Sequence, residues 1–342
     1  MNLADLNKIA LAMVTPGKGI LAADESSGTI KKRFDAIKVE STEDSRRDYR
    51  EMLFRSTEAM SKYISGVILY DETIWQNAKD GTPLVKLIEA SGAIPGIKVD
   101  EGTQALPNCP GELVTIGLDK LAERLKKYYE RGARFAKWRA VIDIAGGNIP
   151  SMTAIHVNAH ALARYAALCQ AAQIVPIVEP EVLMDGDHDI DRCYEVTSRV
   201  LNKTFQELRV QRVALEGMIL KPNMAIAGKK SDKQASVEEV AEKTIRLLKA
   251  CVPAAVPGIA FLSGGQSDED ATAHLNAMNR IGNLPWRLTF SYGRALQAAP
   301  QKAWSGKAEN VAAGQRAFIH RARMNALASK GEWETGLEKK AA

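Results

Sequence analysis

Short apolar segments rich in Ile, Val, Leu and Phe recur along the chain, and long stretches with helical patterning separate them. They begin on average about 38 residues apart, which is enough for a strand, a loop, a helix and a second loop. The segments lie at 20–23, 66–70, 95–99, 134–142, 174–178, 217–220, 258–262 and 287–290. Strand alternating with helix eight times predicts an α/β fold, the (β/α)8 or TIM barrel.

Three of the intervening stretches carry clear helix signals. In 118–132 apolar residues recur every three or four positions before Gly132, and 156–172 is apolar on most faces. The stretch 236–253 opens with Ser236 and Glu239, the pattern of a capping box. No composition shift or Pro/Ser-rich linker divides the 342 residues, so we expect one barrel domain over 1–342, with a short C-terminal tail from about 331 to 342.

Composition excludes several classes of protein. With 46% hydrophobic and 25% charged residues the chain is an ordinary globular one, and no run approaches the roughly 18 apolar residues of a membrane span. The net charge of +5 is spread without a Lys/Arg run, which argues against a nucleic-acid partner but allows a small anion. Four cysteines without a CxxC pair, and a start that does not resemble a secretory leader, predict a cytoplasmic protein.

Polar and charged residues follow nearly every apolar segment. The ends of barrel strands converge on one mouth, and the i, i+2 spacing of Lys137 with Arg139 and of Glu179 with Glu181 puts each pair on one face of its strand. We therefore expect cations and carboxylates to meet in one cavity.

Lys221 is the candidate nucleophile, because it ends an apolar segment and precedes Pro222. Only a neutral amine attacks a carbonyl, and burial near a cation such as Lys137 or Arg139 favours the neutral form. A lysine that reaches out to the rim is the structural alternative.

Carboxylates at other strand ends are candidates for proton transfer. Glu179 and Asp24 are the first choices, since forming an imine and breaking a C–C bond both require proton transfers. Asp71, Glu72, Asp100 and Glu181 are chemically equivalent, and each could equally be structural.

Small and basic residues follow the seventh and eighth segments. Ser263, Gly264 and Gly265 follow the seventh, and Ser291, Gly293 and Arg294 end the eighth. Barrels commonly bind phosphate at this place through backbone N–H groups and a cation, although Gly pairs also form simple turns.

No metal or cofactor is expected. His156 and His160 stand at i, i+4 but lack the glutamate and third ligand of a zinc motif, and the acidic run 185–189 lacks the spacing of a calcium loop. We interpret 185–189 as the loop that starts a helix.

Seven blocks in order along nearly the whole chain resemble the class I fructose-1,6-bisphosphate aldolases. These blocks are GKGILAADESSGTIKKRF (17–34), GIKVDEG (96–102), FAKWR (135–139), IVPIVEPE (174–181), LEGMILKPNM (215–224), FLSGGQS (261–267) and LTFSYGRALQ (288–297).

The resemblance implies reversible cleavage of fructose 1,6-bisphosphate to dihydroxyacetone phosphate and glyceraldehyde 3-phosphate, without metal, in a homotetramer. It places the Schiff base on Lys221, acid/base chemistry on Glu179, and proton transfer and C–C cleavage on Asp24 and Lys137. It assigns one phosphate to Ser263, Gly264, Gly265, Ser291, Gly293 and Arg294, and the other to Arg33, Lys98, Ser26 and Thr29, with Arg139 also in the substrate site.

Two positions depart from the family pattern. Eukaryotic members end in a tail whose final Tyr helps exchange a proton on the enamine, whereas no tyrosine follows Tyr292 here. Glu101 stands where the animal pattern has a lysine. The group that protonates the enamine is therefore an open question.

Two other functions remain to be distinguished. A Schiff-base aldolase for another keto substrate would keep Lys221 and Glu179 but need no second phosphate site. A binding or scaffold protein with a basic barrel mouth would leave Lys221 and Glu179 without a role.

Overall fold

The computed structural model describes residues 1–341 and contains a closed barrel of eight parallel strands. Around the barrel the strands follow one another in chain order, and the last pairs with the first. Every strand expected from the sequence is present, so the predicted (β/α)8 fold is confirmed. The strands are β1 (Gly19–Ala23), β2 (Ile64–Leu69), β3 (Ile94–Lys98), β6 (Phe135–Ile142), β7 (Val175–Val182), β8 (Ile219–Leu220), β9 (Gly258–Phe261) and β10 (Arg287–Tyr292).

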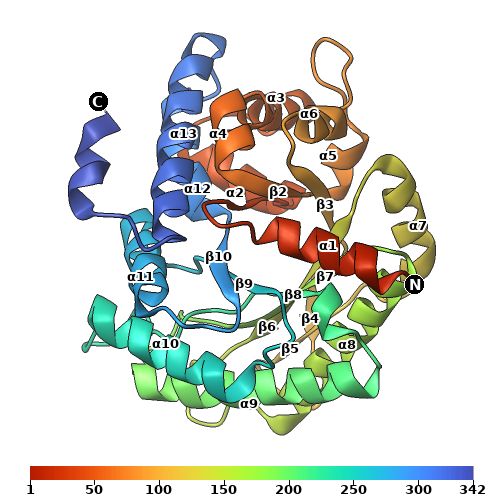
Figure 1. The fold of residues 1–342 in the computed structure, drawn as a ribbon, viewed down its shortest axis with the longest axis vertical. Helices are drawn as coiled ribbons and strands as arrows, with labels where there is room; N and C mark the ends of the chain where they lie inside the picture. Colours follow the sequence, from red (N-terminus) through yellow and green to blue (C-terminus); the bar gives the residue numbers. More distant parts are fainter. Residues whose placement is uncertain (342) are drawn as a thin grey trace.

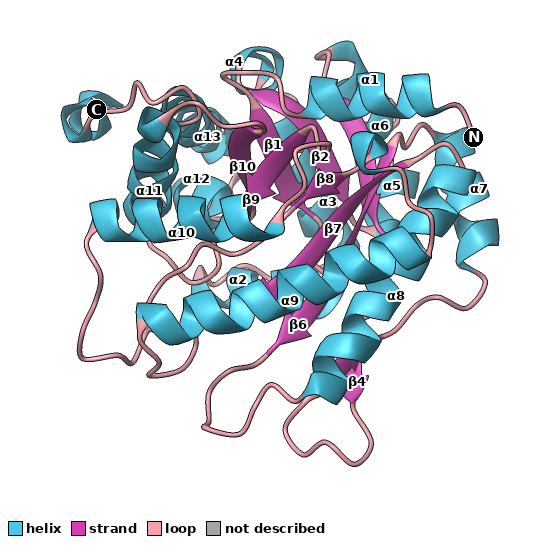
Figure 2. Cartoon of the chain, turned by 60° about the horizontal axis from the view of Figure 1, so that its bottom comes forward, coloured by secondary structure: helices cyan, strands magenta, loops and turns pink. Residues whose placement is uncertain are grey.

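Helices surround the barrel, and in Figure 2 they form a layer outside the strands. The three helices expected from the sequence are α7, α8 and α10. The α-helices are α1 (Leu3–Met13), α2 (Ser27–Ala36), α3 (Glu43–Phe54), α4 (Thr57–Lys62), α5 (Asp71–Trp75), α6 (Leu84–Ala90), α7 (Leu121–Arg131), α8 (Met152–Ala171), α9 (Ile190–Val210), α10 (Val237–Cys251), α11 (Asp268–Ile281), α12 (Arg294–Trp304) and α13 (Val311–Ala328). Short 3-10 turns lie at Leu215–Gly217, Ala308–Asn310 and Thr335–Ala341.

The helix ends follow the signals in the sequence. Gly132 ends α7 with φ of 117°, in the left-handed region that favours glycine. Ser236 caps α10 by accepting a hydrogen bond from Glu239 N, which is one half of the expected capping box. Asp189 caps α9 in the same way, so the acidic run 185–189 is the helix-start loop that we expected.

A helix closes the N-terminal end of the barrel. Leu6, Ala10 and Met13 of α1 are buried in one cluster with residues of several barrel strands, and α1 crosses in front of the strands in Figure 1. Inside the barrel, the ring of Phe135 lies where a Cβ on Gly96 would be, at 2.3 Å. A larger residue at position 96 would therefore displace this ring. Apolar packing thus fills one end, and the polar strand ends lie at the other.

A small hairpin was not expected from the sequence. Strands β4 (Thr103–Ala105) and β5 (Leu113–Thr115) pair antiparallel in the connection between β3 and α7. Each of these strands has only three residues, and the side chains of β4 are exposed. The sequence of β4 therefore lacks the alternation of apolar and polar residues that predicts a strand.

The C-terminal segment packs against the outer helices. Trp333 is buried, its backbone N–H donates to Asn276 of α11, and its indole N–H donates to Glu338. Glu338 also accepts from Arg321 of α13 at 2.7 Å, and Arg321 is only 4% exposed. Figure 1 shows this segment beside α13 on the outside of the molecule.

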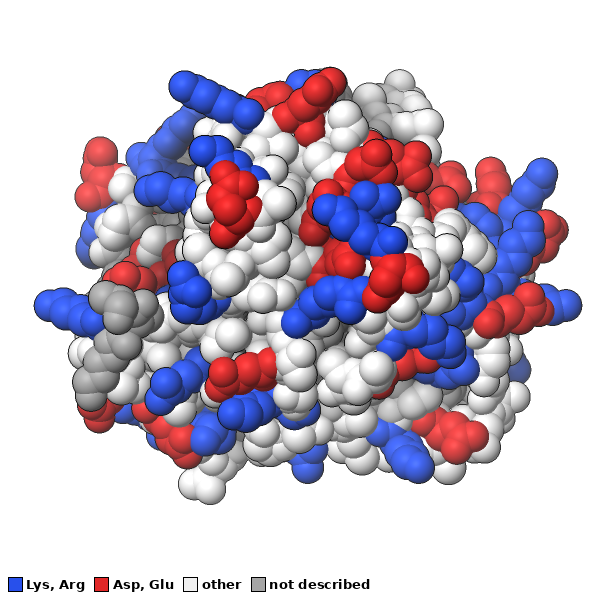
Figure 3. All heavy atoms as spheres, turned by 90° about the horizontal axis from the view of Figure 1, so that it is seen from above, with Lys and Arg blue, Asp and Glu red and all other residues white. Residues whose placement is uncertain are grey.

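Charged residues of both signs are mixed on the surface. On the face seen in Figure 3, Lys and Arg lie among Asp and Glu rather than in one patch. Among residues 1–341, no helix has both the length and the apolar character needed to cross a membrane.

We expect Glu338→Gln to destabilise the protein, because it leaves the guanidinium of Arg321 buried without a charged partner. The loss in the free energy of unfolding should be about 2–4 kcal/mol, measured by urea denaturation at pH 7. Glu309→Gln, at an exposed position, is the matched control and should change stability by about 0.5 kcal/mol or less. Equal effects of the two substitutions would contradict this role of Glu338.

Candidate active site

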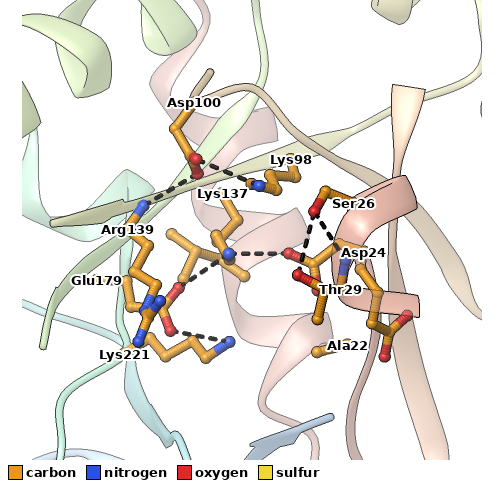
Figure 4. Close-up of polar contacts among 12 residues, drawn as sticks. Ala22, Asp24, Ser26, Thr29, Lys98, Asp100, Lys137, Arg139, Glu179 and Lys221 are labelled. Carbon is orange, nitrogen blue, oxygen red and sulfur yellow. Dashed lines mark hydrogen bonds and ion pairs between the residues drawn. The ribbon is translucent and has the colours of Figure 1, made fainter. Parts of the chain in front are cut away.

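Four residues that lie in or directly after four barrel strands meet inside the barrel (Figure 4). Lys137 lies on β6, Glu179 on β7, and Asp24 and Lys221 directly follow β1 and β8. The backbone N–H of Lys221 still donates to Val178 O of β7, which fixes the start of its side chain beside Glu179. The barrel therefore brings together residues that are nearly 200 positions apart in the sequence.

Lys137 is the centre of this cluster. Its Nζ lies 2.8 Å from Asp24 Oδ2 and 3.3 Å from Glu179 Oε2. Lys221 Nζ lies 3.3 Å from the other oxygen of Glu179, Oε1. Glu179 thus bridges two ammonium groups, and Lys137 bridges two carboxylates.

The four residues of the cluster are removed from water. The side chains of Lys137, Lys221 and Glu179 are 4–6% exposed, and that of Asp24 is 12% exposed. Burial alone would raise the pKa of Glu179, but the cations of Lys137, Lys221 and Arg139 outweigh it and lower this pKa. The pKa of Asp24 is also lowered, because Lys137 and Lys221 overcome its burial.

The pKa of Lys137 is shifted in the opposite direction. Burial favours its neutral form, but the neighbouring carboxylates of Asp24, Glu179 and Asp100 raise its pKa. Lys137 therefore stays an ammonium at neutral pH, and both of its carboxylate partners stay ionised.

The alternation along β6 and β7 has the predicted effect. Arg139 and Glu181, each two residues further along its strand than Lys137 and Glu179, form an ion pair. The backbone N–H of Arg139 donates to Asp100. Asp100 also pairs with Lys98 at 3.4 Å. Asp100 and Glu181, which the sequence left open, thus contact the site cations.

The other two carboxylates that the sequence left open lie elsewhere. Asp71 accepts from the hydroxyl of Tyr128, and Glu72 pairs with Arg46 and Arg50 of α3. Both begin α5 and contact side chains of helices instead of Lys221 or Lys137.

The expected phosphate-binding residues form two groups at the same end of the barrel. In the first, Arg294 at the start of α12 donates to Gly264 O, and Ser263 and Ser291 are buried. Ser291 Oγ has no hydrogen-bond partner among the described residues. The second group includes Ser26, which caps α2, and Thr29, whose hydroxyl is 3.1 Å from that of Ser26.

Arg33 lies next to both groups. It belongs to α2 with Ser26 and Thr29, but a Cβ built on Gly293 would be only 3.7 Å from Arg33 Nη2. The family resemblance places Arg33 in the second group alone, and its proximity to Gly293 is apparent only in the structure.

A buried polar cluster behind Asp24 was also missed. Glu25 accepts from Arg33 at 2.5 Å and from Gln297 at 2.7 Å, and its backbone carbonyl accepts from Arg50. The partners come from α2, α12 and α3, and no spacing in the sequence links them. Glu25 is 7% exposed and Arg50 is 1% exposed. Gln297 also donates to Ala22 O, so this cluster holds the chain on both sides of Asp24.

Nothing in the described part of the chain groups three or more side chains in a way that suits a metal ion. His156 and His160 both face Glu207 of α9, with Nδ1 to carboxylate distances of 3.5 and 3.1 Å. Lys203 also pairs with Glu207, so the histidines belong to a charged contact between α8 and α9.

Comparison with known proteins gives one consistent family. The family model for fructose-bisphosphate aldolase class-I matches residues 5–342. A probable fructose-bisphosphate aldolase class 1 from Xanthomonas campestris is 58% identical over 98% of this chain and 100% of its own length. Fructose-bisphosphate aldolase 1 from Toxoplasma gondii is 56% identical over 97% of this chain and 92% of its own length.

A solved structure is similar throughout. Fructose-bisphosphate aldolase from Plasmodium falciparum, in a complex with TRAP and a small-molecule inhibitor, superposes with a TM-score of 0.96 at 49% identity. The match covers 98% of this chain and 96% of that one. These similarities favour the enzyme over the binding or scaffold protein that the sequence left open.

We expect Lys137→Met to change how stability depends on pH. In the native protein Asp24 and Glu179 have lowered pKa values, so they add stability above their unfolded pKa values near 4, and this stability is lost as pH falls. Most of this loss falls below pH 4, so in the native protein the contribution of the two carboxylates is nearly the same at pH 4 and pH 7. Without Lys137, burial, the largest effect on both groups, raises their folded pKa values above the unfolded ones. Ionising the two carboxylates between pH 4 and pH 7 then costs the variant stability that the native protein does not lose. The loss in the free energy of unfolding caused by Lys137→Met should therefore be larger at pH 7 than at pH 4, by about 1.4 kcal/mol or more. Urea denaturation at the two pH values measures this difference.

Lys126→Met, at an exposed site, is the control and should cost the same at both pH values. Lys137→Arg, which keeps the positive charge, should have a dependence of stability on pH close to that of the native protein. A cost of Lys137→Met that is the same at pH 4 and pH 7 would show that Lys137 does not control the two carboxylates.

Proposed function

The chain belongs to the class-I fructose-bisphosphate aldolase family, and we propose that Lys221 is the residue that forms its Schiff base. The protein is a lyase that cleaves fructose 1,6-bisphosphate reversibly to dihydroxyacetone phosphate and glyceraldehyde 3-phosphate through a lysine imine. The observation that carries the proposal is the buried Lys221 ammonium, 3.3 Å from Glu179, at the end of the barrel.

The contacts of the two buried lysines separate their roles. Lys137 lies between two carboxylates, which raise its pKa and hold it as a cation. Lys221 contacts one carboxylate, and this carboxylate is shared with Lys137. We therefore assign the attack on the carbonyl at C2 to Lys221, while Lys137 supplies fixed positive charge beside it.

Glu179 is placed to move the protons of imine formation. Its two oxygens face the two lysines, so it can accept a proton from the attacking amine and donate one to the departing hydroxyl. Water leaves, and a positively charged imine forms on Lys221. We infer that Glu179, or a water beside it, also protonates the enamine later, since this carboxyl is adjacent to the new imine.

Asp24 and Lys137 act on the bond that breaks. A base removes the proton from the C4 hydroxyl, the C3–C4 electron pair moves into the imine, and an enamine and glyceraldehyde 3-phosphate result. Asp24 is ionised and 2.8 Å from Lys137, so the pair can accept this proton and stabilise the charge that develops on oxygen. Protonation at C3 and hydrolysis of the imine then release dihydroxyacetone phosphate.

The two polar groups at the mouth fit the two ends of the substrate. In the barrel β9 is the neighbour of β8, so the loop at Ser263–Gly265 is close to Lys221. The phosphate on C1, next to the imine carbon, binds there with Ser291, Gly293 and Arg294. The phosphate at C6 binds Lys98, Ser26 and Thr29, with Arg33 between the two groups and Arg139 beside the sugar. Binding both ends orients the reacting bond.

We also propose a cytosolic homotetramer made of one-domain chains. Relatives from Arabidopsis thaliana are named cytosolic aldolases, and the four cysteines are free. A continuous hydrophobic core reaches from Leu21 to Trp333, which supports one domain over residues 1–342 with the tail attached to it. The tetramer follows from the family resemblance, and sedimentation of the purified protein tests it.

Borohydride reduction in the presence of dihydroxyacetone phosphate should attach the substrate to Lys221 only. Peptide mapping by mass spectrometry locates the adduct, and Lys221→Met should abolish it and lower kcat by about 10³-fold or more. Lys137→Met, which leaves the nucleophile in place, should still give an adduct on Lys221. An adduct on Lys137 in the unaltered protein would refute the assignment.

Removing residues 331–342 should leave enamine protonation nearly unchanged in the protein that stays folded. The segment contacts α11 and α13, and Glu179 lies inside the barrel. Loss of Trp333 and Glu338 lowers stability, so the assay is run well below the melting temperature. Exchange of the C3 proton of dihydroxyacetone phosphate is compared with cleavage of fructose 1,6-bisphosphate. A selective tenfold fall in exchange, about 1.4 kcal/mol, would assign the proton step to the tail.

A further inference from the structure

Lys229 lies beside the proposed phosphate loop, and the sequence did not single it out. It follows β8 in a segment that pairs through its backbone with the segment after β7. Lys229 N donates to Met184 O at 2.8 Å, and the neighbouring Gly228 N donates to His188 O at 2.8 Å. These hydrogen bonds fix the backbone of Lys229 next to the mouth of the barrel.

The side chain of Lys229 lies across Gly265. A Cβ built on Gly265 would be 1.8 Å from Lys229 Cε and 2.1 Å from Lys229 Nζ. Any larger residue at 265 would push this ammonium away. The glycine therefore lets a lysine lie directly over the backbone of the loop that we assign to the C1 phosphate.

Both donors at this place have weak partners. The N–H of Gly265 points at Met184 Sδ, and a thioether is a poor acceptor compared with a charged phosphate oxygen. Lys229 Nζ lies 2.8 Å from Asp185 Oδ1, but these side chains are 40% and 60% exposed, and such pairs contribute little free energy. A phosphate could replace both partners at low cost.

We propose that Lys229 binds the C1 phosphate of the substrate, together with the Gly265 amide and Arg294, by exchanging its Asp185 partner for the phosphate. This inference rests on the proposed function, which places that phosphate at Ser263–Gly265. The charge of the phosphate does not change during C–C cleavage, so Lys229 strengthens the binding of substrate and transition state equally. It is a binding residue that acts on KM and leaves kcat unchanged.

The test measures binding of dihydroxyacetone phosphate, which carries only this phosphate. We determine the concentration that gives half-maximal borohydride-trapped adduct on Lys221 at pH 7.5 in 50 mM salt. Lys229→Met should raise this concentration fivefold or more, with kcat for fructose 1,6-bisphosphate changed less than twofold. Lys229→Arg keeps the charge and should restore most of the binding. Inhibition by glyceraldehyde 3-phosphate, which carries the other phosphate, should not change.

Two further variants separate failure of this inference from failure of the proposed function. Lys230→Met removes an exposed neighbouring charge and should leave the half-saturating concentration unchanged, while Arg294→Met should raise it. If Arg294→Met weakens binding and Lys229→Met does not, Lys229 does not bind the phosphate. The proposal that the C1 phosphate binds at Ser263–Gly265 would then remain supported. If neither substitution has an effect, the phosphate does not bind at Ser263–Gly265, and both proposals are wrong. Equal effects of Lys229→Met and Lys230→Met would reduce the role of Lys229 to general positive charge.

Discussion

The contact of the Glu179 carboxylate with two ammonium groups is the constraint on which the rest of the active site depends. An isolated charge in this place would be costly to bury, so each of the four residues is tolerable only because the others are present. The shared contacts also distinguish the two lysines, and on this difference we base the proposal that Lys221 forms the Schiff base. Lys137 has two carboxylate neighbours and stays charged, whereas Lys221 has one, and that one is already shared.

The barrel supplies the rigidity that this cluster requires. Parallel pairing of β6 with β7 sets Arg139 opposite Glu179, so the pairs Lys137–Glu179 and Arg139–Glu181 lie in successive layers of one interior face. Apolar side chains and α1 fill the opposite end, where Phe135 packs over Gly96. The charged residues and the apolar core thus lie at opposite ends of the barrel. The apolar core helps to stabilise the barrel, so the charged end does not depend on its own contacts alone.

The mouth of the barrel differs from its interior in the strength of its contacts. Buried groups such as Glu25 and Arg50 have partners from several helices, which hold the chain around Asp24. At the Ser263–Gly265 loop, which we propose binds a phosphate, the partners are a thioether and an exposed carboxylate. Weak partners suit groups that must exchange them for a ligand, because little free energy is lost when a phosphate replaces them.

The sequence by itself determined the eight strands and the three helices with clear patterning. It also determined that the polar residues following the strands gather at one end of the barrel. Apolar periodicity and cap residues are local signals, and a parallel barrel leaves little choice about where strand ends meet. It also brought Lys221, Glu179, Lys137 and Asp24 forward as candidates, through strand position and the family blocks. Tertiary structure alone decided that Lys137 contacts two carboxylates, that Asp71 and Glu72 face helices, that Arg50 and Gln297 hold Glu25, and that Lys229 lies over Gly265. These contacts join residues far apart in the chain, and side-chain distances of about 3 Å follow from packing that no local pattern encodes.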